Sequence, residues 1–273
     1  MNLETIVKLA LKEDVPKGDI TTNILIPKNK VVSARFVVKE NGIVCGLGIA
    51  KTVFRQLDKK IIFLKKIKDG QEIKSGRVIA EVKGNARVIL TGERTALNFL
   101  QHLSGIATLT NKYVERVKSK KLKVKIYDTR KTTPLLREFE KYAVRCGGGY
   151  NHRMNLSEMV LIKDNHLKLI SQFPNFLVSQ FRNLKIEIEA QKFGQVKKFV
   201  KLKPDIIMLD NMRYQQMKKA IKYIRKNSNC EIEISGNINL KTVKKIAALK
   251  PDRISIGKIT HSAPALDISL EFY

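Results

Sequence analysis

Residues 185–235 read KIEIEAQKFGQVKKFVKLKPDIIMLDNMRYQQMKKAIKYIRKNSNCEIEIS, and this stretch decides the fold. Short runs rich in Ile and other apolar residues alternate in it with longer segments whose apolar residues recur at helical spacing. The short runs are 185–188, 206–209 and 231–234, and the longer segments are 191–202 and 214–226. Alternation of strand and helix predicts a parallel sheet joined by crossover helices.

The same pattern continues on both sides of this stretch. Further strands are predicted at 123–127, 159–162 and 253–256, and a further helix at 240–249. A polar or glycine residue follows each predicted strand, as a β/α barrel with one shared mouth requires, whereas a doubly wound sheet needs such residues only near its switch point. We therefore expect an α/β barrel domain over residues 106–264. It should be open or incomplete, because about 160 residues fall short of the roughly 250 typical of eight units.

Residues 1–105 show a different pattern. Helices are predicted at 3–13, 51–57 and 86–103, and alternating strands at 33–39, 60–67 and 77–82. Alternation with short connections is typical of an antiparallel sheet with one solvated face. We expect an N-terminal α+β domain over 1–105.

The charge of the chain first suggests a nucleic-acid-binding protein. Its 273 residues include 53 Lys and Arg against 25 Asp and Glu, a net charge of +28. The excess is spread along the whole chain, however, whereas a nucleic-acid footprint usually concentrates on one face or tail. We expect no specific nucleic acid as partner, and a basic nucleic-acid-binding protein remains the alternative from another class.

The cysteines and apolar runs indicate the compartment. Cys45, Cys146 and Cys230 are odd in number and far apart, which fits a reducing cytoplasm and neither a disulfide framework nor a zinc finger. No apolar run approaches the ~18 residues of a membrane span, and acidic residues within 1–14 argue against a signal peptide. We expect a cytoplasmic protein with no membrane partner.

Two glycine-containing segments follow the last two predicted strands, Ser235-Gly236-Asn237 and Ile256-Gly257-Lys258. Glycine lets the backbone approach a ligand closely, and the loops after the last strands of β/α barrels commonly hold a phosphate. We expect phosphate binding by both segments. The alternative is that each glycine only makes a tight turn.

Residues 128–153 combine many charges with three consecutive glycines. Arg130 and Lys131 follow a predicted strand, and Arg153 lies in the loop before the next. Together with Lys163 they suit an anionic ligand, because guanidinium groups grip carboxylate or phosphate through paired hydrogen bonds. The alternative for any one of them is ordinary surface charge.

The remaining charges of this region have simpler interpretations. The predicted helix between the two loops carries five charges, and we expect them to form solvated i,i+4 pairs. They are Arg137, Glu138, Glu140, Lys141 and Arg145. We expect His166 to cap the loop after Lys163, and His102 to lie in a helix, in the core or on the surface.

Acidic residues end two neighbouring predicted strands. Glu187 and Glu189 share one strand face, because side chains alternate along a strand, and Asp210 ends the next strand. In a basic site, carboxylates can bind Mg²⁺, hold sugar hydroxyls or stabilise a developing cation. For Glu187, an ion pair with a barrel lysine is an equal alternative.

In this order, the motifs resemble those of the quinolinate phosphoribosyltransferase family over nearly the whole chain. The matching segments are Glu13-Asp14, 18–22, 93–95, 103–108, 129–132, 147–153, 163–166, Ile188-Glu189, 209–211, 235–237 and 260–262. The chain departs from the family at Leu135, where Gly is frequent, and at Lys258, where a small residue is usual.

The resemblance implies an N-terminal sandwich-like domain, rejoined by residues 265–273, beside an open α/β barrel. It implies transfer of phosphoribose from phosphoribosyl pyrophosphate to quinolinate, giving nicotinate mononucleotide, pyrophosphate and CO₂ with Mg²⁺ in NAD biosynthesis. It also implies a homodimer or higher oligomer with composite active sites. A relative with another acceptor, such as nicotinate or that of the molybdenum-locus members, is the alternative.

The resemblance also implies roles for individual residues. The catalytic residues would be Lys131, Lys163, Glu189 and Asp210, with Mg²⁺ at Glu189 and Asp210, directly or indirectly. Quinolinate would contact Arg94, Arg130, His152, Arg153 and Lys163. Phosphoribosyl pyrophosphate would contact Thr129, Lys131, Glu189, Asp210, Ser235, Gly236, Asn237, Ile256, Gly257, Lys258 and His261.

Overall fold

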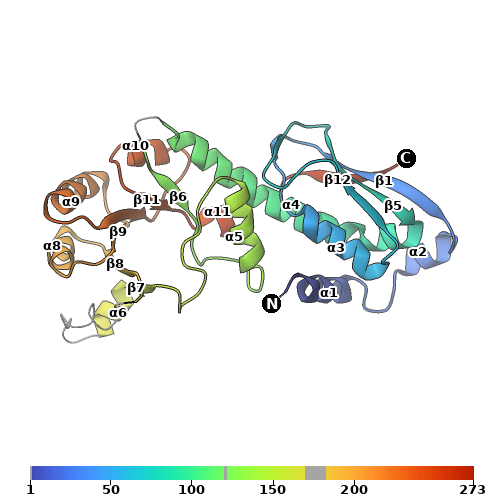
Figure 1. The fold of residues 1–273 in the computed structure, drawn as a ribbon, viewed down its shortest axis with the longest axis horizontal. Helices are drawn as coiled ribbons and strands as arrows, with labels where there is room; N and C mark the ends of the chain where they lie inside the picture. The colour runs from blue at the N-terminus through green and yellow to red at the C-terminus, as the bar shows by residue number, and fades with distance from the viewer. Residues whose placement is uncertain (1, 120–121, 170–182) are drawn as a thin grey trace. The chain divides into compact units, whose positions relative to one another are not determined.

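The computed structural model describes residues 2–119, 122–169 and 183–273, which form two compact units (Figure 1). The first unit comprises 1–111, 132–148 and 259–273, and the second comprises 112–131 and 149–258. We expected one boundary at residue 105, but this residue lies inside a long helix, α4 (Ala86–Val117). The units divide between residues 111 and 112, still within α4, and 132–148 returns to the first unit.

The first unit is built on a four-stranded antiparallel sheet of order β12-β1-β5-β3. Its strands are β1 (Val31–Val38), β3 (Ile62–Lys65), β5 (Val78–Asn85) and β12 (Ile268–Phe272), and a separate pair joins β2 (Gly42–Ile43) to β4 (Glu72–Ile73). The helices are α1 (Leu3–Asp14), α2 (Ile20–Leu25), α3 (Leu47–Leu57), most of α4, and α5 (Arg137–Cys146). The antiparallel sheet expected in this region is present.

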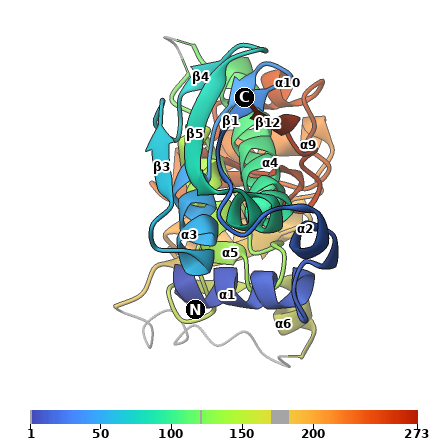
Figure 2. The same cartoon turned by 90° about the vertical axis from the view of Figure 1, so that its right-hand side faces the viewer.

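Aromatic residues join the sheet of the first unit to α3. Phe36 on β1, Phe54 on α3 and Phe63 on β3 have ring centroids 5.8–6.1 Å apart. All three are buried, so they contribute much of the apolar area in this core. On its other side α3 contacts α1 (Figure 2).

The end of the chain is part of this first core. Strand β12 pairs with β1 from Ala34–Phe272 to Val38–Ile268. The amide of Leu266 donates to the carbonyl of Gln101, at 3.0 Å, and the Gln101 side chain donates to the carbonyl of Ile268, at 2.8 Å. The last residues are thus hydrogen-bonded to both the sheet and α4.

The second unit contains a six-stranded parallel sheet of order β6-β11-β10-β9-β8-β7. Its strands are β6 (Lys125–Tyr127), β7 (Val160–Ile162), β8 (Ile186–Ala190), β9 (Ile206–Asp210), β10 (Glu231–Ser235) and β11 (Arg253–Ser255). Consecutive strands from β7 to β11 are neighbours and β6 lies beside β11, so the order never reverses as it does in a doubly wound sheet. Because no pairing between β6 and β7 is found in the described residues, the structure confirms the open barrel.

Helices connect the barrel strands. They are α6 (Asp164–Leu169), α8 (Phe193–Lys201), α9 (Tyr214–Asn227), α10 (Val243–Ala247) and, crossing the boundary between the units, α11 (Lys258–His261). Helices α8 and α9 lie side by side (Figure 1). No helix among the described residues is long and apolar enough to cross a membrane.

Two of the charges predicted to be solvated on α5 are buried instead, whereas Glu138 and Arg145 are exposed. Glu140 and Lys141 have no exposed surface. Glu140 accepts hydrogen bonds from His102 Nε2, at 2.8 Å, and from the amide of Thr133, at 3.1 Å. The prediction was wrong because helical spacing shows which residues share a face, but not which other elements cover that face.

Candidate active site

The carboxyl ends of the barrel strands carry most of the predicted site residues. Parallel pairing places Ile162 beside Ile188, and Asp210 beside Ser235. The residues that continue from these ends therefore lie at one edge of the sheet. They are Thr129, Arg130 and Lys131 after β6, Lys163 after β7, Glu189 on β8, Asp210 on β9, Ser235, Gly236 and Asn237 at β10, and Ile256, Gly257 and Lys258 after β11.

Glu189 and Asp210 form the acidic part of this edge. Glu189 is only 5% exposed, and its Oε2 lies 3.7 Å from Nζ of Lys163. Burial raises the pKa of Glu189, and the neighbouring Asp210 carboxylate raises it further, whereas Lys163 lowers it. Two neighbouring carboxyl groups of which one has a raised pKa favour an additional cation beside them.

Arg130 and Arg153 form the cationic part. Arg153 is buried, and its Nη1 donates to the carbonyl of Met159, at 2.9 Å. Burial lowers the pKa of Arg153, and the positive charge of Arg130 lowers it further. Two guanidinium groups close enough to affect each other in this way suit a ligand with negative charge.

The glycine segment after β10 is shaped by a contact with the loop after β9. Gly236 has φ +90°, and a Cβ added there would lie 2.1 Å from Oδ1 of Asn211. The same Oδ1 accepts from Nδ2 of Asn237, at 3.2 Å, and Nδ2 of Asn211 donates to Asp210, at 2.7 Å. Only glycine fits at position 236. The backbone of this loop can therefore approach a neighbouring group closely, as a loop that binds a phosphate must.

The loop after β11 shows fewer features of a phosphate-binding loop than the loop after β10. The Ile256 amide donates to the carbonyl of Tyr127, at 3.0 Å, which fixes the loop to β6. Ile256 is buried and Lys258 is exposed. Phosphate binding by Ile256-Gly257-Lys258 stays a prediction.

Comparison with known proteins identifies the family. The family model described as quinolinate phosphoribosyl transferase, N-terminal domain, matches residues 19–104, and the model of the C-terminal domain matches residues 106–271. The chain belongs to the quinolinate phosphoribosyl transferase family.

Individual members of the family cover the whole chain. The nicotinate-nucleotide pyrophosphorylase structure from Ehrlichia chaffeensis is 38% identical, with a TM-score of 0.93, covering 100% of this chain and 99% of that one. NadC from Streptococcus pyogenes is 40% identical, with a TM-score of 0.91, covering 99% and 97%. The chloroplastic nicotinate-nucleotide pyrophosphorylase (carboxylating) of Arabidopsis thaliana is 38% identical over 99% of this chain and 82% of its own length. These matches place the strand-end residues in the context of a family of transferases.

The ring of His152 contacts two acidic side chains of the barrel strands. Its Nε2 lies 3.0 Å from Oε2 of Glu187 and 3.5 Å from Oε1 of Glu233. Its backbone amide donates to Asp128, at 2.7 Å. The pairing of Glu187 with a barrel lysine, considered from the sequence, is wrong, because a histidine occupies that position. Contact of His152 with quinolinate stays a prediction.

Four other residues complete the account of the site. His166 caps the loop after β7 as predicted, because its Nδ1 accepts from the amide of Lys163, at 3.0 Å. Arg94 is an exposed residue of α4, and His261 is exposed at the end of α11, so both belong to the first unit. Asn211 was not predicted as a site residue, although its position directly after Asp210 at a strand end was a usable signal.

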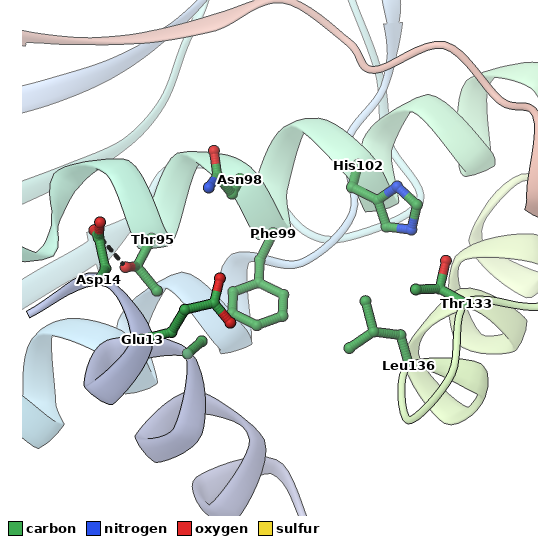
Figure 3. A pocket seen from close by; sticks show the side chains of 9 residues that line it. Glu13, Asp14, Thr95, Asn98, Phe99, His102, Thr133 and Leu136 are labelled. Carbon is green, nitrogen blue, oxygen red and sulfur yellow. Dashed lines mark hydrogen bonds between the residues drawn. The ribbon is translucent and has the colours of Figure 1, made fainter. Parts of the chain in front are cut away.

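The first unit also contains a pocket of about 320 Å³ with none of the predicted site residues (Figure 3). It is lined by Ala10, Glu13, Asp14, Thr95, Asn98, Phe99, His102, Thr133 and Leu136. Thr95 donates to Asp14, at 3.3 Å. Phosphate or dicarboxylate binding does not suit this lining, because its ionised groups include two carboxylates.

Proposed function

We propose that the chain is a quinolinate phosphoribosyltransferase (decarboxylating) of NAD biosynthesis. It would transfer the phosphoribosyl group of phosphoribosyl pyrophosphate to quinolinate and release nicotinate mononucleotide, pyrophosphate and CO₂. The observation that carries this proposal is the cationic pair Arg130–Arg153 at the same sheet edge as the acidic pair Glu189–Asp210. One pair suits a dicarboxylate, and the other suits the positive charge that develops on a ribose.

Quinolinate would bind at the cationic part of the edge. Its two carboxylates match Arg130 and Arg153, and Lys163 supplies a third positive charge next to Glu189. The burial of Arg153 strengthens its attraction for a carboxylate, because the surrounding dielectric is low. These contacts would set the pyridine nitrogen toward the ribose.

Phosphoribosyl pyrophosphate would lie along the adjoining strand ends. Lys131 is exposed after β6 and would contact its phosphates, and the glycine segments after β10 and β11 would hold the 5′-phosphate. The tight packing of Gly236 on Asn211 supports this assignment for the β10 loop.

The chemistry follows from these positions. The bond between ribose C1 and pyrophosphate breaks as the pyridine nitrogen forms a bond to C1, and the pyrophosphate leaves with the electron pair. Glu189 and Asp210 would stabilise the positive charge that develops at C1. The resulting pyridinium accepts the electron pair of the adjacent C–CO₂⁻ bond, CO₂ departs, and a proton takes its place on the ring.

Magnesium fits the acidic pair. The two carboxylates offer oxygen ligands, which Mg²⁺ prefers, and their mutual repulsion, expressed in the raised pKa of Glu189, is what a divalent cation would offset. Glu189 and Asp210 would hold the ion directly or through water. When bound, it would neutralise the pyrophosphate leaving group.

The proposal extends to assembly and location. We propose a homodimer in which Arg94 of one subunit completes the quinolinate site of the other, which the family resemblance and the exposure of Arg94 support. Higher oligomers would keep the same shared sites. We propose a cytoplasmic location, which the free thiols of Cys45, Cys146 and Cys230 support.

The decisive assay measures products. Purified protein is incubated with carboxyl-labelled quinolinate, phosphoribosyl pyrophosphate and Mg²⁺, and CO₂ and nicotinate mononucleotide are quantified. Equal amounts of both products are expected, and omission of Mg²⁺ should abolish them. Reaction with nicotinate and none with quinolinate would overturn the proposal, as would turnover with neither.

A further inference from the structure

His152, Glu187 and Glu233 form a buried cluster inside the second unit. Glu187 comes from β8, Glu233 from β10 and His152 from the loop before β7. Both carboxylates have no exposed surface, and His152 is 8% exposed. One ligand atom from each of the three residues lies within 4.8 Å of the other two.

Nε2 of His152 faces both carboxylates. In the described part of the chain, no donor makes a well-aligned hydrogen bond to either oxygen of Glu187 or Glu233. Nε2 of His152 lies 3.0 Å from Glu187 and 3.5 Å from Glu233. A buried carboxylate without a donor is strongly destabilising, so a proton on Nε2 would stabilise both carboxylates.

The other ring nitrogen faces a donor. The backbone amide of Arg153 donates to Nδ1 of His152, at 2.9 Å. Burial by itself lowers the pKa of His152, but Glu187 and Glu233 together raise it to about 10. These carboxylates favour a second proton on the ring, whereas the Arg153 amide opposes one on Nδ1. The neutral and the doubly protonated ring both carry the Nε2 proton.

A metal ion is the obvious competitor for these three residues, and the contacts oppose it. A metal on Nε2 would displace the Nε2 proton, and a ligating histidine normally donates its other N–H to an acceptor. Here Nδ1 meets the amide of Arg153, which is a donor. Arg253 and Arg153 also act on Glu187 with positive charge already.

We propose that Glu187 and Glu233 are positioning residues that hold the Nε2–H of His152 and thereby fix the backbone of Arg153 for quinolinate. The role toward quinolinate rests on the proposed function. The contacts on their own favour a proton on Nε2 over a metal at this place.

The first test measures the protonation of His152 directly in the free protein and requires no enzymatic turnover. The chain has four histidines, so ¹⁵N-histidine spectra of the free protein can be assigned by single His→Gln variants. The expected result is a His152 Nε2 that carries a slowly exchanging proton at neutral pH, unchanged by added Zn²⁺ or Mn²⁺. An unprotonated Nε2, or loss of the signal with stoichiometric metal, would overturn the proposal.

The second test compares the effect of a variant on the KM for quinolinate with its effect on the KM for phosphoribosyl pyrophosphate. Glu187→Leu removes both charge and acceptor, whereas Glu187→Gln keeps a carbonyl acceptor. Glu187→Leu should raise the quinolinate KM roughly tenfold or more, the size expected for a lost charge-assisted hydrogen bond, with the KM for phosphoribosyl pyrophosphate within about twofold of wild type. Glu187→Gln should be affected less and should keep the Nε2 proton.

The matched control is Glu231→Gln. Glu231 lies on the same strand as Glu233, but its side chain is 46% exposed and pairs with Arg253. This variant should leave both KM values unchanged. Parallel increases of both KM values in Glu187→Leu would indicate general damage and overturn the positioning role. If Glu187→Leu does not fold, Glu233→Leu replaces it, because it also removes both charge and acceptor, and an unchanged quinolinate KM there overturns the role. Absence of turnover in wild type would instead refute the proposed function and leave the histidine spectrum interpretable.

Discussion

Nζ of Lys163 lies 3.7 Å from Oε2 of Glu189, across the ends of the neighbouring strands β7 and β8. The lysine side chain is 48% exposed, whereas the glutamate side chain is 6% exposed. Lys163 opposes the rise in the pKa of Glu189 that burial and Asp210 cause. The pair therefore places a buried carboxyl group beside a cation that an incoming carboxylate can reach.

Removing either acidic residue should affect turnover more than substrate binding. In Glu189→Ala and Asp210→Ala, kcat should fall roughly a hundredfold, because their charge matters chiefly when positive charge develops on the ribose. The Kd of quinolinate, measured by calorimetry, should change much less. Glu115→Ala, an exposed residue paired with Lys118, serves as control. An unchanged kcat in both variants would remove these residues from the mechanism.

Gly236→Ala should damage the phosphate loop. The new Cβ would lie 2.1 Å from Asn211 at a φ of +90°, so the loops after β9 and β10 must move apart. We expect a rise of at least about tenfold in the KM for phosphoribosyl pyrophosphate, with quinolinate binding retained. Gly194→Ala is the matched control, since a Cβ there meets nothing within 4 Å. Equal KM values in the two variants would contradict the assignment.

Asp19 should contribute a pH-dependent part of the stability. It caps α2 by accepting from the amide of Thr22, at 3.0 Å, and hydrogen bonds from Thr22 lower its pKa below the ordinary 3.8. The contribution is therefore complete above the unfolded-state pKa and is lost as the pH falls through the lower folded-state value. Asp19→Ala should lower the free energy of unfolding by about 1 kcal/mol at pH 7.

Urea unfolding at pH 7 and pH 3 measures this effect. The difference between wild type and Asp19→Ala should shrink at the lower pH. Asp19→Asn keeps a capping oxygen without the titration, so it should be closer to wild type at pH 7. A difference of the same size at both pH values would show that ionisation of Asp19 contributes nothing.

Much of the fold could be predicted from alternation along the chain. Local periodicity predicts the parallel strands, the helices between them and the polar residues after each strand. The barrel could therefore be predicted from the sequence. The split of the units was not, because 132–148 joins the first unit through tertiary contacts such as that of Glu140 with His102. Periodicity also could not show that Glu140 and Lys141 would be covered.

The site was predictable to a similar depth. Arg130, Lys163, Glu189 and Asp210 lie at or shortly after the carboxyl ends of parallel strands, so the topology alone brings them to one edge. The contacts of His152 were not predictable, because Glu187 and Glu233 stand on strands separated by β9. Packing across the barrel decides which side chains of distant strands meet inside it. The spacing of residues along the sequence does not show which of them will meet.

The last prediction concerns shared active sites. Arg94 belongs to the first unit, whereas Lys163 follows a barrel strand in the second. If a homodimer builds each site from the barrel of one subunit and Arg94 of the other, Arg94→Ala and Lys163→Ala homodimers should both have little activity. After subunit exchange, a mixed dimer carries one site with both defects and one site with neither.

Mixing the two inactive variants should therefore restore about half of the wild-type activity per mixed dimer, since one of its two sites is intact. With equal amounts and random exchange, half of the dimers are mixed, so about a quarter of the wild-type activity is expected. Exchange is verified by mass spectrometry of differently tagged subunits, and mixing Arg94→Ala with differently tagged Arg94→Ala provides the control. No recovery despite verified exchange would mean that Arg94 acts within its own chain or has no part in the site.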